Sequence, residues 1–134
     1  MKDKSDELQN LIHDSKKRGF LFLHKQLFGQ PKKYFVLSKD CTLNYFNEKK
    51  EFSSRKKINI TSDVKVKESP EKEETGKYTL EIDTEHRTYK LSTDSESERD
   101  SWIKALKDII LLSREVNDKE LRPNIAESSG ENTA

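Results

Sequence analysis

The sequence has few of the residues from which disulfides, metal sites and membrane spans are built. Cys41 is the only cysteine among 134 residues, so the chain cannot form an internal disulfide or supply the thiolates of a typical zinc cage. No apolar run approaches the roughly 20 residues of a membrane-spanning helix. The first residues are too acidic and polar for a signal peptide, and position 2 is not the glycine that myristoylation requires. We therefore expect a cytoplasmic protein, in which a lone cysteine stays reduced.

The motifs of the common enzyme classes are also missing. The four glycines form no glycine-rich phosphate loop. The histidines and the cysteine show neither the spacing of metal ligands nor the pattern of an activated nucleophile. We expect a protein that is not an enzyme and that carries neither a cofactor nor a metal.

Charge is abundant but unevenly distributed. The formal net charge of the whole chain is +1, yet residues 16–57 contain twelve Lys and Arg against three Asp and Glu. Residues 68–134 show the opposite bias, with ten Lys and Arg against seventeen Asp and Glu. Such a separation of positive from negative charge attracts anions to one part of a molecule and repels them from the other. This pattern is more typical of a binding protein than of a catalyst.

Short segments rich in aromatic and β-branched residues alternate with turn signals through the middle of the chain. In residues 78–82 apolar and polar side chains alternate, as in a strand with one buried face. Gly-Gln-Pro at 29–31 and Asp-Thr-Glu at 83–85 are typical of turns. Strands are predicted at residues 19–24, 33–37, 42–46, 58–60, 64–67, 78–82 and 87–91. Seven short antiparallel strands in succession indicate a mainly β barrel or sandwich.

One helix is predicted after the last strand. Ser95 and Glu98 have the spacing of a capping box at a helix start. The apolar residues that follow would share one helical face: Trp102, Ala105, Leu106, Ile109 and Ile110. We expect this face to cover one end of the barrel, with Trp102 as a structural core residue and not a ligand contact.

The two ends of the chain have a different composition from the middle. Residues 1–15 show only a weak helical pattern at Leu8, Leu11 and Ile12, so we expect an N-terminal extension that holds a short helix. Residues 114–134 are polar and are expected to form a flexible C-terminal tail. The predicted domain therefore spans residues 16–113.

Several of these segments resemble one known family. Residues 17–21 (Lys-Arg-Gly-Phe-Leu), 33–37 (Lys-Tyr-Phe-Val-Leu) and 43–46 (Leu-Asn-Tyr-Phe) are similar to the first three strands of the pleckstrin homology (PH) domain. Trp102 falls where that family has its signature helix tryptophan. The resemblance covers residues 16–113. It implies a seven-stranded antiparallel barrel or sandwich, capped by one C-terminal α-helix.

The resemblance also implies a site. In similar PH domains, phosphoinositide head groups bind in a mouth between the loop joining strands one and two and the loop joining strands three and four. Leu23 stands where the best lipid binders of the family have lysine, and Lys33 stands where they have arginine. Lys25 shares the face of Leu23, because side chains alternate along a strand. The residues expected to bind the head group are Lys25, Lys32, Lys33, Tyr45, Arg55, Lys56 and Lys57.

The residue types of this set predict weak selectivity among head groups. Lysine acts on phosphate as a point charge, whereas arginine offers a planar fork. Each cation near an anionic leaflet contributes about 1 kcal/mol, so five or six together hold a domain at a membrane. We expect a monomer that binds anionic phospholipid membranes peripherally, through phosphoinositides as a class or phosphatidic acid.

The sequence also bears on two other classes of partner. A protein-interaction adaptor with little or no lipid specificity is the main alternative, because related folds bind peptides at an open strand edge or in an aromatic groove. Nucleic acid is not expected as a partner. The acidic half of the chain would repel a long polyanion, and the isoelectric point of about 7.8 is below that of typical nucleic-acid binders.

Leu27 and Phe28 lie between the two basic strand segments, where the tip of a hairpin is expected. An exposed Leu-Phe pair beside phosphate-binding lysines could enter the acyl boundary of a bilayer, as interfacial anchors do. The alternative is that both side chains fold back onto the rim of the barrel.

Replacing Leu27 and Phe28 by serine distinguishes these alternatives. Insertion predicts weaker binding to anionic vesicles in co-sedimentation, with unchanged binding of soluble head groups in calorimetry, because only the apolar contact is lost. Equal losses in both assays would contradict insertion.

Overall fold

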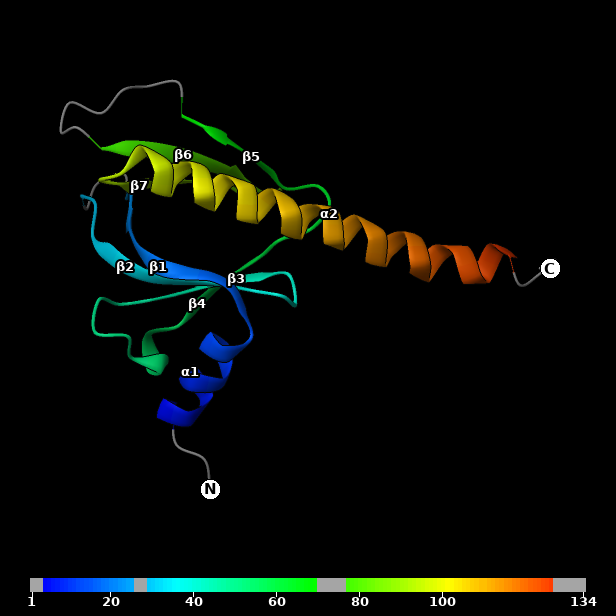
Figure 1. Ribbon diagram of the computed structural model, residues 1–134, viewed down its shortest axis with the longest axis horizontal. Helices are drawn as coiled ribbons and strands as arrows, with labels where there is room; N and C mark the ends of the chain where they lie inside the picture. The colour runs from blue at the N-terminus through cyan, green and yellow to red at the C-terminus, as the bar shows by residue number, and fades with distance from the viewer. Residues whose placement is uncertain (1–3, 26–28, 70–76, 127–134) are drawn as a thin grey trace.

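Two α-helices, one short 3-10 helix and seven strands are the regular elements of the described part of the chain. The computed structural model describes residues 4–25, 29–69 and 77–126. The elements are α1 (Lys4–His13), β1 (Ser15–Leu23), β2 (Lys32–Ser38), β3 (Thr42–Phe46), the short 3-10 helix η1 (Phe52–Ser54), β4 (Lys56–Asn59), β5 (Lys65–Glu68), β6 (Tyr78–Asp83), β7 (Thr88–Thr93) and α2 (Glu96–Ala126), as Figure 1 shows. Neither of these helices combines the length and the apolar character needed to cross a membrane.

The strands form one antiparallel sheet in the order β4-β3-β2-β1-β7-β6-β5. β1 pairs with β2 along its length, from Ser15 opposite Ser38 to Phe22 opposite Lys32. Its pairing with β7 joins Phe22 to Ser92 and Leu23 to Leu91, at the end of β1. Helix α2 contacts β1 on one side of this junction and β5, β6 and β7 on the other. The predicted fold, seven antiparallel strands with one C-terminal helix, is confirmed.

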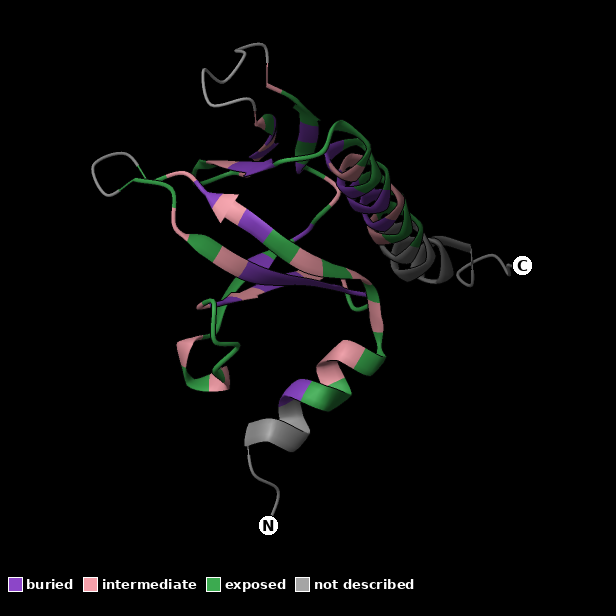
Figure 2. Cartoon of the chain, turned by 60° about the vertical axis from the view of Figure 1, so that its left-hand side comes forward, coloured by how far each residue is buried: buried purple, intermediate pink, exposed green. Residues whose placement is uncertain are grey.

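The main core lies between α2 and the face of the sheet that we call the inner face. Leu21 and Leu23 of β1 and Phe35 of β2 belong to the same buried cluster as Trp102 and Leu106 of α2. All five residues of the predicted apolar stripe are buried, and Trp102 is only 1% exposed. Figure 2 shows the buried positions of α2 turned toward the strands. The structural role expected for Trp102 agrees with this burial.

Helix α1 lies on the opposite, outer face of the sheet. Its Leu8 joins Tyr34, Val36 and Phe46 in a second, smaller apolar cluster. Leu11, Ile12 and Phe52 pack against that cluster. The weak helical pattern of the first fifteen residues therefore corresponds to a helix that covers part of the outer face.

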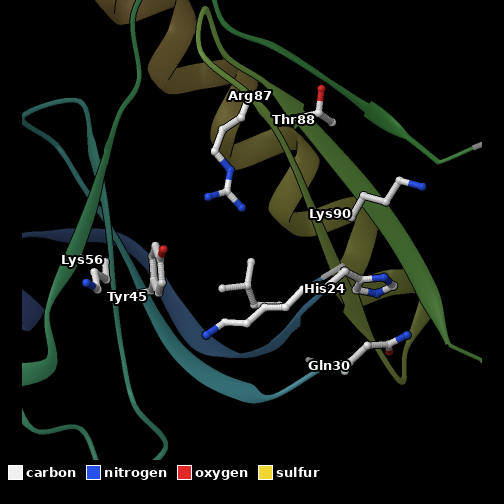
Figure 3. A pocket seen from close by; sticks show the side chains of 10 residues that line it. His24, Gln30, Tyr45, Lys56, Arg87, Thr88 and Lys90 are labelled. Atoms are coloured by element: carbon white, nitrogen blue, oxygen red, sulfur yellow. The ribbon is translucent and has the colours of Figure 1, made fainter. Parts of the chain in front are cut away.

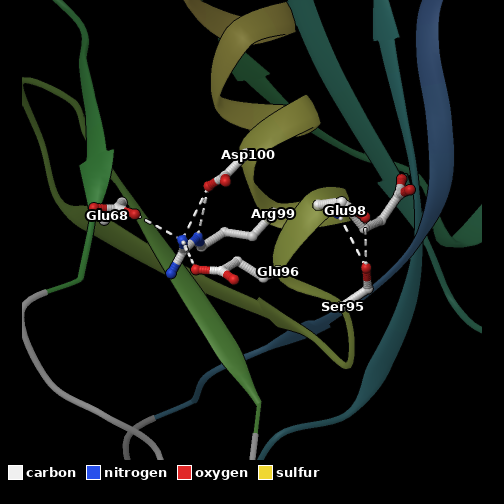
Figure 4. Close-up of polar contacts among 7 residues, drawn as sticks. Glu68, Ser95, Glu96, Glu98, Arg99 and Asp100 are labelled. Atoms are coloured by element: carbon white, nitrogen blue, oxygen red, sulfur yellow. Dashed lines mark hydrogen bonds and ion pairs between the residues drawn. The ribbon is translucent and has the colours of Figure 1, made fainter.

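Polar contacts fix the start of α2. The Ser95 hydroxyl accepts a hydrogen bond from the Glu98 backbone N–H at 3.2 Å, which is the first half of the predicted capping box. The Glu98 carboxylate pairs with Lys17 Nζ of β1 at 2.8 Å. Arg99 is buried and forms ion pairs with Glu68 of β5 at 2.6 Å and with Asp100 at 3.0 Å (Figure 4). These contacts attach the helix to β1 on one side of the β1–β7 junction and to β5 on the other.

Most element boundaries differ from the sequence prediction by one or two residues, and two differ by four residues or more. β1 begins at Ser15 and not at Gly19, because charged residues occupy its first half and hide the apolar alternation. Lys16 Nζ in that half pairs with Asp108 of α2 at 3.4 Å. α2 continues to Ala126, past the expected start of the polar tail after Ser113. Residues 114–122 are rich in Glu, Lys, Leu and Arg, which favour helix without requiring an apolar stripe.

We predict that Trp102→Ala destabilises the domain by about 3–5 kcal/mol, because it leaves a large cavity between α2 and the inner face. Trp102→Phe should cost clearly less, since an aromatic ring remains. Within the described residues Trp102 Nε1 also has no hydrogen bond to lose. Urea unfolding measures both free energies. A loss below about 1 kcal/mol for Trp102→Ala would show that the helix does not depend on this residue.

Candidate functional site

A pocket of about 1120 Å³ opens on the inner side of the sheet. It is lined by the residues that follow β1, by the facing positions of β3 and β4, and by the first residues of β7. Its polar lining includes Lys25, Gln30, Tyr45, Lys56, Arg87 and Lys90 (Figure 3). The segments that supply these side chains are far apart in the sequence, so only the fold brings them together.

Strand register places Tyr45 and Lys56 side by side. Leu43 of β3 is opposite Ile58 of β4, and both are in the main core. Two residues along the same face, Tyr45 is opposite Lys56. The Tyr45 ring stacks on Phe35 of β2 at a centroid distance of 5.1 Å. This stacking fixes the phenol, while the hydroxyl end reaches the pocket.

A backbone hydrogen bond between Lys25 and Gly29 closes the base of the β1–β2 loop and holds Lys25 in place. Its backbone N–H donates to the Gly29 carbonyl at 2.8 Å. Gly29 has a φ of +78°, a left-handed conformation that glycine adopts without steric cost. Lys25 lies two residues beyond the buried Leu23, so alternation directs both toward the same face. The sequence predicted Lys25 for the site on this same argument, and it does line the pocket.

Arg87 comes from the hairpin between β6 and β7. The Arg87 carbonyl accepts hydrogen bonds from the Thr84 backbone N–H at 2.9 Å and from its hydroxyl at 2.8 Å, which close the hairpin. The guanidinium carbon lies 4.3 Å from the centroid of the Tyr89 ring. In Figure 3 the guanidinium points across the pocket toward Tyr45. Arg87 thus supplies a guanidinium group to the pocket lining.

The pocket is electropositive. The lining residues include four Lys and Arg side chains and, among the described residues, no Asp or Glu. Within the described ranges, Lys25, Lys56 and Arg87 form no ion pair with a carboxylate. His24 Nε2 lies 3.0 Å from Ser92 Oγ at the pocket edge. Because Lys25, Lys56 and Arg87 gather here without carboxylate partners in the described ranges, the pocket is a candidate site for an anion.

Burial changes the ionisation of one group in the pocket. Desolvation raises the pKa of the Tyr45 phenol, and the nearby Tyr89 raises it further, although Arg87 opposes both effects. The phenol therefore keeps its proton at neutral and mildly alkaline pH. Tyr45 can donate a hydrogen bond to an anion throughout that range.

Three of the seven residues predicted from sequence line this pocket, namely Lys25, Tyr45 and Lys56. Lys33 is on the inner face opposite Leu21, but it is not among the lining residues. Lys32 is on the outer face, with its Nζ 5.2 Å from the centroid of the Phe20 ring. Leu27 and Phe28 lie outside the described residues.

Arg55 and Lys57 flank Lys56 and alternate to the other side of the sheet. Lys57 is opposite Asn44 on the outer face. The Arg55 Nε–H donates to Asn44 Oδ1 at 2.8 Å. Arg55 also lines a smaller depression of about 570 Å³ next to α1. The run of three cations at residues 55–57 therefore divides between two faces.

Sequence reasoning missed Arg87, Lys90 and Gln30. The antiparallel pairing of Leu23 with Leu91 brings the residues after β1 next to the first residues of β7. The turn at residues 83–85 was visible in the sequence, but its place beside the β1–β2 loop depends on long-range strand pairing. Only a topology with β7 next to β1 could have identified Arg87 and Lys90, whereas Gln30 belongs to the β1–β2 connection and was overlooked there.

Comparisons with known proteins agree with this architecture. The C-terminal PH domain of pleckstrin superposes with a TM-score of 0.61 at 23% identity, over 72% of this chain and 96% of that one. The PH domain of human oxysterol-binding protein-related protein 11 gives 0.60 at 23% identity, over 75% of this chain and 83% of that one. The pleckstrin C-terminal PH domain in complex with D-myo-Ins(1,2,3,5,6)P5 gives 0.62 at 22% identity, over 72% and 95%. A search of curated proteins gave no match.

At such identities the structural likeness shows a shared fold. The family itself is shown by a sequence model of the PH domain, which matches residues 14–111. This match includes all seven strands and Trp102, and it agrees with the resemblance seen in the sequence. The chain therefore belongs to the PH domain family.

Proposed function

We propose that this PH domain binds the phosphorylated head group of anionic phospholipids in the basic pocket and thereby docks peripherally on the cytoplasmic face of membranes. The observation that carries the proposal is the convergence of Lys25, Lys56 and Arg87 on one pocket whose described lining has no acidic side chain. PH domains are generally non-catalytic binding modules, and many bind phosphoinositides. The composition of the pocket supports the same role for this chain.

The chemistry of the pocket favours phosphate monoesters. Arg87 offers a planar set of donors that fits two phosphate oxygens at once, and Lys25 and Lys56 add mobile charges. The Tyr45 hydroxyl supplies a neutral donor whose orientation is fixed by the stacking on Phe35. The pleckstrin domain of the same fold that was solved with an inositol pentakisphosphate supports phosphorylated inositol as the ligand class.

The size of the pocket favours binding of several kinds of head group over selection of one. Its volume of about 1120 Å³ is slightly above the range of about 300–1,000 Å³ that is usual for small-molecule sites. A head group with several phosphates fits such a space together with water. With one arginine and otherwise lysines as its cations, we propose that the site accepts phosphoinositides as a class, or phosphatidic acid.

The pocket cations can be tested with a double variant. Lys25→Ala with Arg87→Ala should weaken binding of soluble inositol hexakisphosphate at least about a hundredfold, because each of the two lost hydrogen bonds to a charged group contributes about 1.5–3 kcal/mol. Isothermal titration calorimetry gives the affinities, and vesicle co-sedimentation across a panel of phosphoinositides and phosphatidic acid gives the lipid preference.

Two controls make that result specific to the pocket. Lys65→Ala with Lys107→Ala removes the same charge from exposed positions of β5 and α2 and should leave the affinity nearly unchanged. Arg55→Ala should also have little effect, because Arg55 binds Asn44 next to α1. An equal loss of affinity in the Lys65→Ala with Lys107→Ala variant would show that binding depends on the overall charge and not on the pocket. Wild-type protein that binds no anionic lipid would favour the protein-interaction alternative.

Tyr45→Phe isolates the neutral donor. The variant should bind inositol hexakisphosphate about two- to tenfold more weakly, since one hydrogen bond contributes about 0.5–1.5 kcal/mol and the ring still stacks on Phe35. Because the pKa of the Tyr45 phenol is raised, the ratio of the two affinities should stay constant from pH 7 to pH 9. A ratio of one at pH 7 would exclude Tyr45 from the contact.

A further inference from the structure

A second depression lies on the outer face of the sheet, next to α1. Its volume of about 570 Å³ is within the range of about 300–1,000 Å³ that is usual for small-ligand sites. Helix α1 contacts both β2 and η1 here, so the N-terminal extension supplies one wall (Figure 1). We call this site the α1 depression, and its lining includes Leu11, Asp14, Ser38, Lys39, Phe52 and Arg55.

Part of the α1 depression lies outside the region that identifies the family. The PH-domain model matches residues 14–111, whereas α1 spans Lys4–His13. Leu11 of α1 and Phe52 of η1 pack against the same outer-face cluster, and both side chains are half-buried. Their exposed parts give the depression an apolar wall. A ligand at this wall would contact an addition to the common fold.

A chain of hydrogen bonds positions Arg55 in the lining. The Arg55 Nε–H donates to Asn44 Oδ1 at 2.8 Å, and Asn44 Nδ2 donates to Thr42 Oγ1 at 3.2 Å. The Thr42 hydroxyl in turn donates to Asp40 Oδ1 at 2.6 Å. The Arg55 guanidinium carbon also lies 5.3 Å from the centroid of the Phe52 ring. The Nη groups of Arg55 form no hydrogen bond or ion pair within the described residues, so they are available to a ligand.

Ser38 carries a buried hydroxyl without a partner. The residue lines the depression and is only 3% exposed. Among the residues that the structure describes, Ser38 Oγ forms no hydrogen bond. A buried hydroxyl that makes no hydrogen bond is unfavourable, and nearly all such groups in proteins have a partner. A ligand that offers Ser38 a polar group therefore gains affinity from that contact.

Charges of both signs line the depression. Lys39 and Arg55 supply cations, and Asp14 and Asp40 supply carboxylates. Within the described ranges, Lys39, Asp14 and Arg55 form no ion pair. The two carboxylates would repel a ligand with several phosphates. A peptide instead offers backbone N–H donors to carboxylates and acceptors to cations and hydroxyls. The mixed charge therefore favours a protein segment over a polyanion.

We propose that the α1 depression binds a short segment of a partner protein, in which an acidic side chain lies beside an apolar one. Arg55 holds the carboxylate through its Nη groups, since a guanidinium offers a planar fork that fits a carboxylate. The apolar side chain packs against Leu11 and Phe52, and a polar backbone group bonds to the Ser38 hydroxyl. None of these four residues lines the basic pocket, so this inference is independent of the proposed function.

The first test identifies the peptide. The probe is a phage-displayed library of short random peptides, selected on the immobilised full chain with inositol hexakisphosphate in excess. The inositol phosphate competes with acidic peptides for the basic pocket and so directs selection to other sites. The enriched peptides should share an Asp or Glu next to an apolar residue. Enriched peptides without an acidic residue, or no enrichment, would overturn the proposal.

The second test is a double-mutant cycle on Arg55. One enriched peptide is synthesised with its acidic residue and with the corresponding amide, and calorimetry measures binding of both to wild type and to Arg55→Gln. Each single change should weaken binding about tenfold or more, because it removes a hydrogen bond between charged groups. The two changes together should cost little more than one, since both remove the same contact. Losses that multiply would overturn the proposal.

Arg18→Gln is the matched control for that cycle. Arg18 is exposed and is opposite Val36 of the outer-face cluster, so it removes the same charge from the same face outside the depression. This variant should bind the peptide nearly as wild type does. A loss equal to that of Arg55→Gln would reduce the effect to overall charge and overturn the proposal.

Ser38→Ala separates binding from folding. The midpoint of urea unfolding should not fall, because the described structure shows no hydrogen bond of Ser38 Oγ to lose. The peptide should nevertheless bind about two- to tenfold more weakly, since its hydrogen bond to the hydroxyl is removed. An unchanged affinity for the peptide would contradict the proposed site.

The basic pocket is tested with the same peptide. Lys25→Ala with Arg87→Ala should bind the peptide nearly as wild type does, and Arg55→Gln should keep its affinity for inositol hexakisphosphate. A peptide that loses affinity for the Lys25→Ala with Arg87→Ala variant binds in the basic pocket, which would overturn this inference. Wild-type protein that binds the peptide but no anionic lipid would support this inference and contradict the proposed function alone.

Discussion

The burial of the apolar stripe of α2 against the inner face is the contact on which the rest of the structure depends. β1 pairs with β7 through Phe22 and Leu23, so the two parts of the sheet share only a short junction. Helix α2 joins them by placing Trp102 and Leu106 in the same core as residues of β1 and β7. Ion pairs of Glu98 with Lys17 and of Arg99 with Glu68 attach the start of the helix on both sides. With one end of the barrel filled in this way, its inner side remains open elsewhere as a pocket.

Strand alternation then decides which cations serve the pocket. Lys56 faces it, whereas its neighbours Arg55 and Lys57 lie toward the outer face. The basic half of the chain therefore divides between two surfaces on opposite sides of the sheet. Arg87 and Lys90 belong to the acidic half of the sequence, yet they complete the basic lining. The positive charge of the pocket lining is thus arranged by the fold and only partly by the order of residues along the chain.

Local patterns predicted the parts of this structure that depend on local physics. The helical stripe from Trp102 to Ile110 and the alternation in β6 identified those elements, because one face of each is buried. Lys25 and Tyr45 followed from the resemblance and from alternation. Arg87 could not be found, since its place depends on pairing between β1 and β7, which are far apart in sequence. The charged start of β1 and the end of α2 were missed because ion pairs and helix propensity, not apolar periodicity, favour these segments.

The most direct test of the central claim, that phosphorylated head groups bind in the basic pocket, is an NMR titration of the ¹⁵N-labelled protein with inositol hexakisphosphate. The account predicts that the largest amide shift changes occur at Lys25, Tyr45, Lys56 and Arg87, which converge on the pocket from four strands or their connections. Amides of α1 should change little, because this helix lies on the outer face. Changes centred on α1, or no saturable changes at all, would contradict the account.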